Sequence, residues 1–187
     1  MSQALNIPNA LTILRIMLVP LLTFLLIHGE YGAAIWVLLG AGLSDALDGA
    51  IAKRFNLMTE LGAFLDPLAD KALVITSILT LAWKGLLAWW LAEVIIVRDL
   101  VILGGAVAYY LRAGRLEMAP TIPSKVNTCI QVCLIFVIIL TAAGMAPTTG
   151  WLLRVIMGCT LVTTVFSGVH YVTVWGRKAA QLKKDEL

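Results

Sequence analysis

Long apolar runs, separated by short polar stretches, are the dominant pattern along this chain of 187 residues. A helix needs about 20 apolar residues to cross the ~30 Å hydrocarbon core of a membrane at ~1.5 Å per residue. Six runs approach or exceed that length, at residues 10–28, 33–53, 64–83, 86–111, 124–145 and 150–174. The pattern predicts an all-α integral membrane protein with six transmembrane helices and a short interfacial segment at the amino terminus.

The composition agrees with a membrane protein. Hydrophobic residues make up 60% of the chain and charged residues 13%, which is too apolar for an ordinary soluble domain. The sequence has no internal repeat, so we expect a single domain over residues 1–187. The first apolar run lacks a basic segment before it and a small-residue cleavage site, so we expect it to stay in the protein rather than act as a cleaved signal.

Most of the lysines and arginines fall on one side of the membrane if six helices alternate in direction. That side carries Arg15, Lys53, Arg54, Arg112, Arg115, Lys125, Arg177, Lys178, Lys183 and Lys184, and the other side carries Lys84 and Arg154. The positive-inside rule then places both termini in the cytoplasm, with a bacterial inner membrane as the simplest location. The net charge of +3 forms a rim that suits anionic lipid headgroups. No basic cluster lies outside that rim, which argues against a nucleic-acid partner.

The stretch SDALDGAIAKRFNLMTELGAFLDPLADK, from Ser44 to Lys71, carries four aspartates inside this apolar chain. Asp45 and Asp48 share a helical face because they are three apart, and Asp66 and Asp70 share one because they are four apart. A polar turn between the pairs predicts two antiparallel neighbouring helices. We expect the two pairs to meet at similar depth, just below the cytoplasmic surface.

Four carboxylates this close cannot all stay ionised without cations, because like charges raise one another's pKa. Oxygen ligands favour hard divalent ions such as Mg²⁺ or Mn²⁺. Two such ions bridged by shared carboxylates are a common apparatus for displacement at phosphorus. The sequence therefore predicts a site for two ions that acts on a phosphate ester.

Other roles for the aspartates are open. They are also able to pair with Lys71, Arg98 or Arg15, or to line a path in a divalent-ion or proton transporter. A transporter predicts polar positions along the far half of the helices as well. The far half carries only Lys84, Arg154, His28 and Glu30, all near loops. A purely structural scaffold gives no reason to bury four acids.

The same residues resemble the signature D-x2-D-G-x2-A-R-x8-G-x3-D-x3-D of the CDP-alcohol phosphatidyltransferases, membrane enzymes of phospholipid synthesis. The matching positions are Asp45, Asp48, Gly49, Ala52, Lys53, Gly62, Asp66 and Asp70. Lys53 departs from the family, which usually has arginine there. Lysine keeps the charge but loses the bidentate fork, so either Lys53 or Arg54 would serve the diphosphate.

The resemblance implies that all four aspartates hold two Mg²⁺ or Mn²⁺ ions and that Asp70 also acts as the general base. It implies CDP-diacylglycerol as the donor and a homodimer as the assembly. The implied CDP-lipid contacts are Asn9, Thr12, Arg15, Gly49, Ala52, Lys53, Thr59 and Gly62. Without the resemblance, the segment NIPNALTILR reads only as a capped helix start with an interfacial arginine.

The central part, RDLVILGGAVAYYLRAGRLEMAPTIPSKVNT, is similar to cardiolipin synthases of the CDP-diacylglycerol-dependent, mitochondrial type. Phosphatidylglycerophosphate synthases tend to have G-K-x-K-T where this chain has SKVNT, so Asn127 replaces a lysine. A glycerol-3-phosphate dianion would need that cation more than the single charge of phosphatidylglycerol. The resemblance implies phosphatidylglycerol as the acceptor, with cardiolipin and CMP as products; the alternative is phosphatidylglycerophosphate synthesis from glycerol-3-phosphate.

Five residues are candidates for binding the acceptor phosphate: Arg98, Arg112, Arg115, Lys125 and Asn127. Each has a simpler alternative. Arg98 and its neighbour Asp99 can form an ion pair that satisfies itself, and the other cations can serve only to set the topology.

Overall fold

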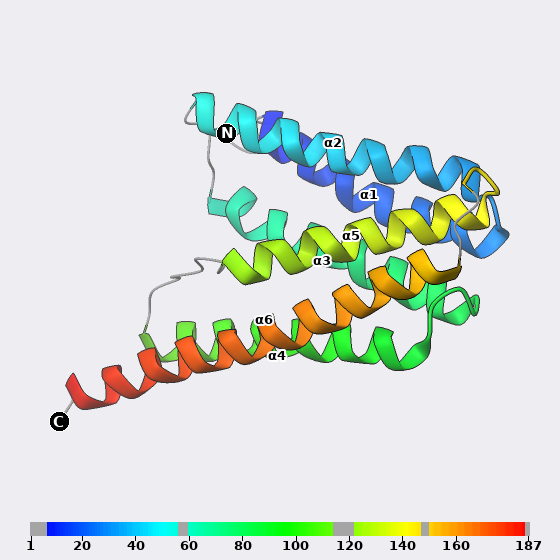
Figure 1. Cartoon of the computed structure of the whole chain (residues 1–187). Helices are drawn as coiled ribbons and strands as arrows, with labels where there is room; N and C mark the ends of the chain where they lie inside the picture. The colour runs from blue at the N-terminus through cyan, green and yellow to red at the C-terminus, as the bar shows by residue number, and fades with distance from the viewer. Residues whose placement is uncertain (1–6, 56–59, 114–121, 147–149, 186–187) are drawn as a thin grey trace. The chain divides into compact units, whose positions relative to one another are not determined.

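A computed structural model gives the structure of the chain (Figure 1). It describes the backbone of residues 7–55, 60–113, 122–146 and 150–185, and the side chains of residues 13–44, 69–105, 122–146 and 150–174. Within these residues the chain forms six α-helices and no strand. They are α1 (Ile7–His28), α2 (Tyr31–Phe55), α3 (Glu60–Trp83), α4 (Trp89–Ala113), α5 (Ile122–Ala142) and α6 (Gly150–Asp185).

The prediction of an all-α fold is confirmed, and each expected apolar run corresponds to one helix. Of the described residues, Ile122–Ala142 and Gly150–Val174 form helices long and apolar enough to cross a membrane. Ile13–His28 and Tyr31–Ser44 are shorter apolar helices. The largest difference in bounds is at α6, which continues to Asp185 because the tail after residue 174 contains strong helix formers such as alanine, glutamine and lysine.

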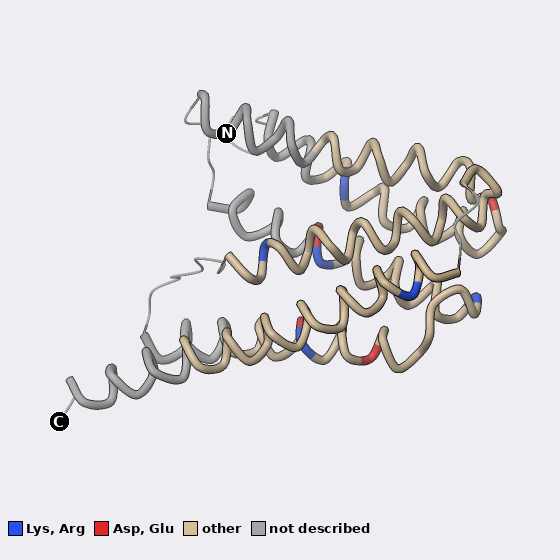
Figure 2. The backbone as a smooth tube through the Cα atoms, viewed as in Figure 1, with Lys and Arg blue, Asp and Glu red and all other residues tan. Residues whose placement is uncertain are grey.

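The helices group into two compact units. The first unit contains Met1–Leu87 and Ile135–Thr148, and the second contains Ala88–Leu134 and Thr149–Leu187. The helix α5 therefore contributes its first part to the second unit and its last part to the first. Charged residues are sparse along the described helices of both units (Figure 2).

In the first unit, α1 packs against both α2 and α3. Apolar residues on one face of each helix are fully or almost fully buried, at the spacing of three or four that a helix requires. They include Leu22, Leu26, Ala34, Ile35, Leu38, Ala41, Leu73, Val74, Ile78 and Leu81. This packing sets α1 as the common neighbour of the two helices that carry the aspartates.

Three helices of the first unit end in the same way. Gly29, Gly85 and Gly144 follow α1, α3 and α5 with φ values of 78°, 72° and 69°. In each case the amide after the glycine donates to the carbonyl five residues back, as Glu30 does to Leu25 at 2.9 Å. This is the Schellman arrangement, which needs a left-handed residue and so favours glycine.

Lys84 joins two of these helix ends. It lies in the turn after α3, and its Nζ donates to the carbonyl oxygen of Ile27 at 3.0 Å, in the last turn of α1. A cation is stabilising at this position because the carbonyl end of a helix carries partial negative charge. The α1 and α3 ends are therefore held together by a side chain as well as by packing.

In the second unit, α4 packs against α6 at a close approach that two glycines make possible. A Cβ on Gly105 would lie 3.0 Å from Cε1 of Tyr171, and a Cβ on Gly168 would lie 3.3 Å from Cγ of Arg98. The hydroxyl of Tyr171 also donates to the carbonyl oxygen of Ile102 at 2.9 Å. These contacts bring the polar side chains of α4 directly against α6.

The helix ends generate the first prediction. Gly85→Ala will lower the free energy of unfolding by about 1–2 kcal/mol, because an L-residue is strained at this left-handed position. Gly40→Ala is the matched control, since Gly40 is in the interior of α2 and no atom lies within 4 Å of the added Cβ. Thermal unfolding in detergent should show a lower midpoint for the first variant only; equal midpoints would contradict the assignment of the motif.

Candidate functional site

The four aspartates predicted as metal ligands lie on two helices of the first unit. The helix α2 carries Asp45 and Asp48, and α3 carries Asp66 and Asp70. Both helices pack against α1. Of the four side chains, only that of Asp70 belongs to the described part of the chain, so the meeting of the two pairs at one depth stays a prediction.

Asp70 is bound by Arg15, which comes from α1. Nη1 of Arg15 donates to Oδ1 of Asp70 at 2.6 Å, across 55 residues of sequence. The side chain of Arg15 is 2% exposed and that of Asp70 is 41% exposed. A buried guanidinium needs a counter-charge, so this ion pair links α1 to the acidic face of α3. The sequence offered Arg15 as an alternative partner for the aspartates, and the structure places it on Asp70.

The four aspartates predicted as ligands are chemically suited to a hard divalent cation, and that role stays a prediction. Among the side chains that the structure describes, no group of three or more His, Cys, Asp or Glu can hold a metal, but these side chains include only one of the four aspartates. The predicted donor set consists entirely of carboxylate oxygens, which suit Mg²⁺ or Mn²⁺. The partial exposure of Asp70 is compatible with such a role, because a carboxylate offers about four lone-pair sites and can bind more than one partner.

The other residues predicted to bind the CDP-lipid lie around the same helices. Positions on helices whose side chains are outside the described residues are Asn9 and Thr12 on α1, Gly49, Ala52 and Lys53 on α2, and Gly62 on α3. Thr59 lies in residues 56–59, outside the described backbone. Their contacts with a nucleotide therefore stay predictions.

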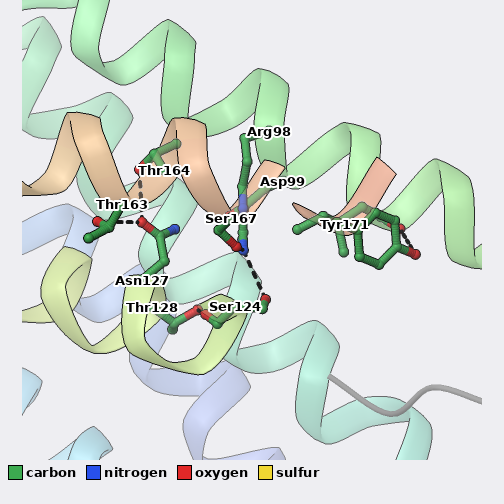
Figure 3. Close-up of polar contacts among 10 residues, drawn as sticks. Arg98, Asp99, Ser124, Asn127, Thr128, Thr163, Thr164, Ser167 and Tyr171 are labelled. Carbon is green, nitrogen blue, oxygen red and sulfur yellow. Dashed lines mark hydrogen bonds and ion pairs between the residues drawn. The ribbon is translucent and has the colours of Figure 1, made fainter. Parts of the chain in front are cut away.

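Arg98, the first candidate for the acceptor phosphate, is the centre of a buried cluster in the second unit. Its side chain is 4% exposed, and Nη1 donates to Oδ1 of Asp99 at 2.6 Å. Nη2 donates to the hydroxyl of Ser124 on α5 at 2.9 Å and to that of Ser167 on α6 (Figure 3). The structure thus gives Arg98 the ion pair with Asp99 that was the simpler alternative to phosphate binding.

Asn127, the last candidate, is fully buried between α5 and α6. Its Oδ1 accepts from Thr163 at 3.0 Å and from Thr164 at 2.9 Å (Figure 3). Lys125 is exposed near the start of α5. The side chain of Arg112, on α4, and all of Arg115 lie outside the described residues. Two neighbouring candidates thus differ in exposure: Asn127 is buried, whereas Lys125 is exposed.

The sequence interpretation missed a polar seam between α5 and α6. Ser124 and Ser167 both accept a hydrogen bond from Arg98, and Asn127 accepts one from Thr164. Because residue numbers rise along α5 as they fall along α6, the two helices are antiparallel. One turn further along each helix, Gln131 and Thr160 are fully buried. The spacing of Thr160, Thr164, Ser167 and Tyr171, by four, three and four, is the signal that identifies this face of α6 in the sequence.

Comparison with known proteins gives the class of the protein. The family model for CDP-alcohol phosphatidyltransferase matches residues 5–166. The chain belongs to this family, which confirms the resemblance carried by the aspartate signature.

Individual relatives are more specific. The rat (Rattus norvegicus) protein "Cardiolipin synthase (CMP-forming)" is 34% identical over 97% of this chain, and the match covers 65% of the rat protein. "Probable phosphatidylglycerophosphate synthase" of Mycobacterium tuberculosis is 32% identical over 89% of this chain and 80% of its own length. "Cardiolipin synthase (CMP-forming)" of Streptomyces coelicolor is 36% identical over 54% of this chain and 50% of its own length. The chain thus spans just under two thirds of the rat relative.

The buried pair generates the second prediction. Asp99→Leu leaves the Arg98 charge without its carboxylate and will destabilise the protein by about 3–5 kcal/mol. The double variant Arg98→Met/Asp99→Leu will recover most of that loss, because an apolar pair replaces an ionic one. Thermal unfolding in detergent measures both effects, with Glu93→Leu as control because Glu93 is exposed on the same helix.

Activity of the double variant separates the two interpretations of Arg98. A folded double variant without transferase activity indicates contact with the acceptor phosphate, whereas retained activity indicates a structural ion pair. An Asp99→Leu protein as stable as the parent would contradict the buried pair itself.

Proposed function

We propose that this chain is a metal-dependent phosphatidyltransferase that moves a phosphatidyl group from CDP-diacylglycerol to phosphatidylglycerol, giving cardiolipin and CMP. The observation that carries the proposal is the eight-position signature from Asp45 to Asp70, which lies within the matched residues 5–166. The names of the rat and Streptomyces relatives support the same product. Membership of a phosphatidyltransferase family favours an enzyme over the transporter considered from sequence.

Asp70 is the general base in this proposal. Its carboxylate takes the proton of the acceptor hydroxyl, whose oxygen then forms a bond to the lipid-side phosphorus of the diphosphate. The bond from that phosphorus to the bridging oxygen breaks, and CMP leaves with this oxygen. The 41% exposure of Asp70 supports the role, because a base must be reachable by its substrate.

The remaining signature residues hold the donor. Two Mg²⁺ or Mn²⁺ ions bound by Asp45, Asp48, Asp66 and Asp70 would supply positive charge to the diphosphate. Lys53 adds a cation on the same helix as the first pair of aspartates, and Gly49 leaves space for close approach of the nucleotide. These side chains act by charge and position, which is how enzymes of phosphoryl transfer stabilise the reacting group.

Phosphatidylglycerol as the acceptor is supported by the charges around the candidate phosphate site. Arg98 is already paired with Asp99 at 2.6 Å, and Asn127 is neutral and bound to two threonines. Of the candidates whose side chains are described, this leaves Lys125 as the exposed cation. A phosphodiester with one negative charge suits such a site better than a phosphate dianion.

Phosphatidylglycerophosphate synthesis is the second candidate. The M. tuberculosis relative that bears this name matches over 80% of its own length, more than the rat cardiolipin synthase does. In this case glycerol-3-phosphate would take the place of phosphatidylglycerol, with the same donor and the same base.

We further propose that all six helices span the membrane, with both termini and the acidic site on the cytoplasmic side of a bacterial inner membrane. The excess of lysine and arginine at the ends assigned to that side supports this orientation. A homodimer is proposed by analogy with the family.

An acceptor assay tests the main proposal. The purified chain, supplied with CDP-diacylglycerol and Mg²⁺, will form cardiolipin and CMP when phosphatidylglycerol is added. Thin-layer chromatography or mass spectrometry identifies the lipid product, and a chelator should abolish its formation. If the chain forms phosphatidylglycerophosphate from glycerol-3-phosphate and no cardiolipin from phosphatidylglycerol, the second candidate is the correct function.

Substitution of the base gives the fourth prediction. Asp70→Asn will lower turnover by about 10²–10⁴-fold, the range typical of a lost general base. The same change also weakens the partner of Arg15, so loss of stability has to be separated from loss of chemistry. Turnover and thermal unfolding are therefore measured on the same preparations.

The double variant Arg15→Gln/Asp70→Asn provides that separation. It removes both charges, so it should regain stability while staying inactive. Glu93→Gln, at an exposed carboxylate of α4, is the matched control and should keep full turnover. An Asp70→Asn enzyme with full turnover rules out the base assignment.

A further inference from the structure

Exposed tryptophans gather where α4 and α6, the two packed helices of the second unit, begin. Trp89 and Trp90 are the first two residues of α4, and Trp151 is the second residue of α6. All three side chains are exposed. Tryptophan is enriched where a membrane meets water, because its ring is apolar and its N–H is polar. These residues indicate that both helices enter the membrane at this end.

Arg154 lies at the level of these tryptophans. Contacts between α4 and α6 join residues whose numbers differ by about 70 and rise together along both helices, as in Arg98 with Gly168. At ~1.5 Å per residue, Trp89 is therefore level with a point about 7 Å beyond Arg154 on α6, and Trp151 lies about 4.5 Å before Arg154. The tryptophans of the two helices thus bracket the arginine along the membrane normal.

The surroundings of Arg154 offer its charge no counter-ion. The side chain is exposed, and its exposed neighbours on α6 are the apolar Trp151, Leu152 and Val155. Neither α4 nor α6 has an acidic residue in its first turn. Among the residues that the structure describes, none forms a hydrogen bond or ion pair with Arg154. An arginine on an apolar membrane helix extends its guanidinium to the headgroups, and a long side chain in a helix points back toward the helix start.

We propose that Arg154 and Trp151 bind a phospholipid with a net negative charge at the membrane surface where α6 begins. The inference rests on the part of the proposed function that makes α6 a transmembrane helix, for which Gly150–Val174 is long and apolar enough. The two residues are three apart, so their side chains are neighbours on the helix surface. The guanidinium binds two oxygens of the lipid phosphate, and the indole ring packs on the glycerol and the upper acyl chains.

This lipid is separate from the substrates of the candidate acceptor site. Ser167, where α6 meets Arg98, lies about 20 Å further along α6 at ~1.5 Å per residue. Charge sets the preference for the headgroup. Phosphatidylcholine carries its own cation beside the phosphate, and this cation competes with the arginine, whereas phosphatidylglycerol carries only the negative charge. We expect an anionic preference of about 5-fold, the gain typical of one basic residue near a charged membrane surface.

Quenching of tryptophan fluorescence by brominated lipids measures this preference at one place. The full chain is prepared with Trp151 as its only tryptophan, and phenylalanine replaces the other five: Trp36, Trp83, Trp89, Trp90 and Trp175. It is reconstituted in vesicles that contain brominated phosphatidylglycerol or brominated phosphatidylcholine. Bromine quenches only at short range, so the signal reports lipids beside Trp151 and no lipid in the acceptor site. A matched chain keeps only Trp36, which is exposed on α2 with no lysine or arginine of that helix within two turns.

The Trp151 chain should bind phosphatidylglycerol about 5-fold more strongly than phosphatidylcholine, and the Trp36 chain should bind both equally. Arg154→Gln should bring the ratio at Trp151 to about 1, because it removes the charge. Arg154→Lys keeps the charge without the bidentate fork and should keep part of the preference. High salt should lower the ratio in the parent, because the site is exposed to solvent ions.

The outcomes separate this inference from the proposed function. Equal binding of the two lipids at Trp151, or a preference that survives Arg154→Gln, overturns the inference and leaves Arg154 as a charge that sets topology. The absence of quenching at Trp151 by either lipid overturns the inference together with the proposed membrane span of α6. A preference of the expected size in a chain that is inactive with both acceptors refutes only the proposed reaction.

A second measurement covers the case in which the chain with five phenylalanines does not fold. Native mass spectrometry compares Arg154→Gln with the parent, both with all six tryptophans, in detergent that contains phosphatidylglycerol or phosphatidylcholine. The parent should retain more phosphatidylglycerol per chain than the variant and the same amount of phosphatidylcholine. Equal retention of phosphatidylglycerol by the two proteins overturns the inference.

Discussion

A positive charge buried inside an apolar helical unit is stable only beside a negative one, and each unit of this chain contains such a pair. Arg15 is matched by Asp70 in the first unit and Arg98 by Asp99 in the second, both at 2.6 Å. Loss of one partner leaves the other charge buried and uncompensated, which is strongly unfavourable. The Arg15–Asp70 pair therefore constrains how α1 faces α3, and the hydrogen bonds from Arg98 to Ser124 and Ser167 constrain how α4 faces α5 and α6.

The two pairs differ in what their carboxylates can do next. Asp99 is 2% exposed, so its carboxylate is out of reach of a ligand and neutralises Arg98 inside the second unit. Asp70 is 41% exposed, so it can take part in ligand binding while it still neutralises Arg15. This difference is the reason why Asp70 can neutralise Arg15 and still be proposed as a catalytic group, and why we expect its replacement to affect both stability and turnover.

The sequence was sufficient for the helices and for the family. Apolar runs located every helix, and the spacing of Asp45, Asp48, Asp66 and Asp70 identified a family that the comparisons confirm. The sequence could not identify Arg15 as the partner of Asp70, because a contact across 55 residues depends on the rotation of α1 against α3. The polar seam between α5 and α6 could have been predicted from the spacing of Thr160, Thr164 and Ser167. It was missed because the sequence analysis considered mainly charged residues.

The division of α5 between the units has a consequence for how the protein unfolds. The helix is continuous from Ile122 to Ala142, but residues up to Leu134 group with one unit and those from Ile135 with the other. Separate melting of either unit would require α5 to fray up to its middle, where a helix gives up its hydrogen bonds one residue after another. We therefore expect the shared helix to couple the unfolding of the two parts, because melting of either one would remove hydrogen bonds from a helix to which the other also contributes.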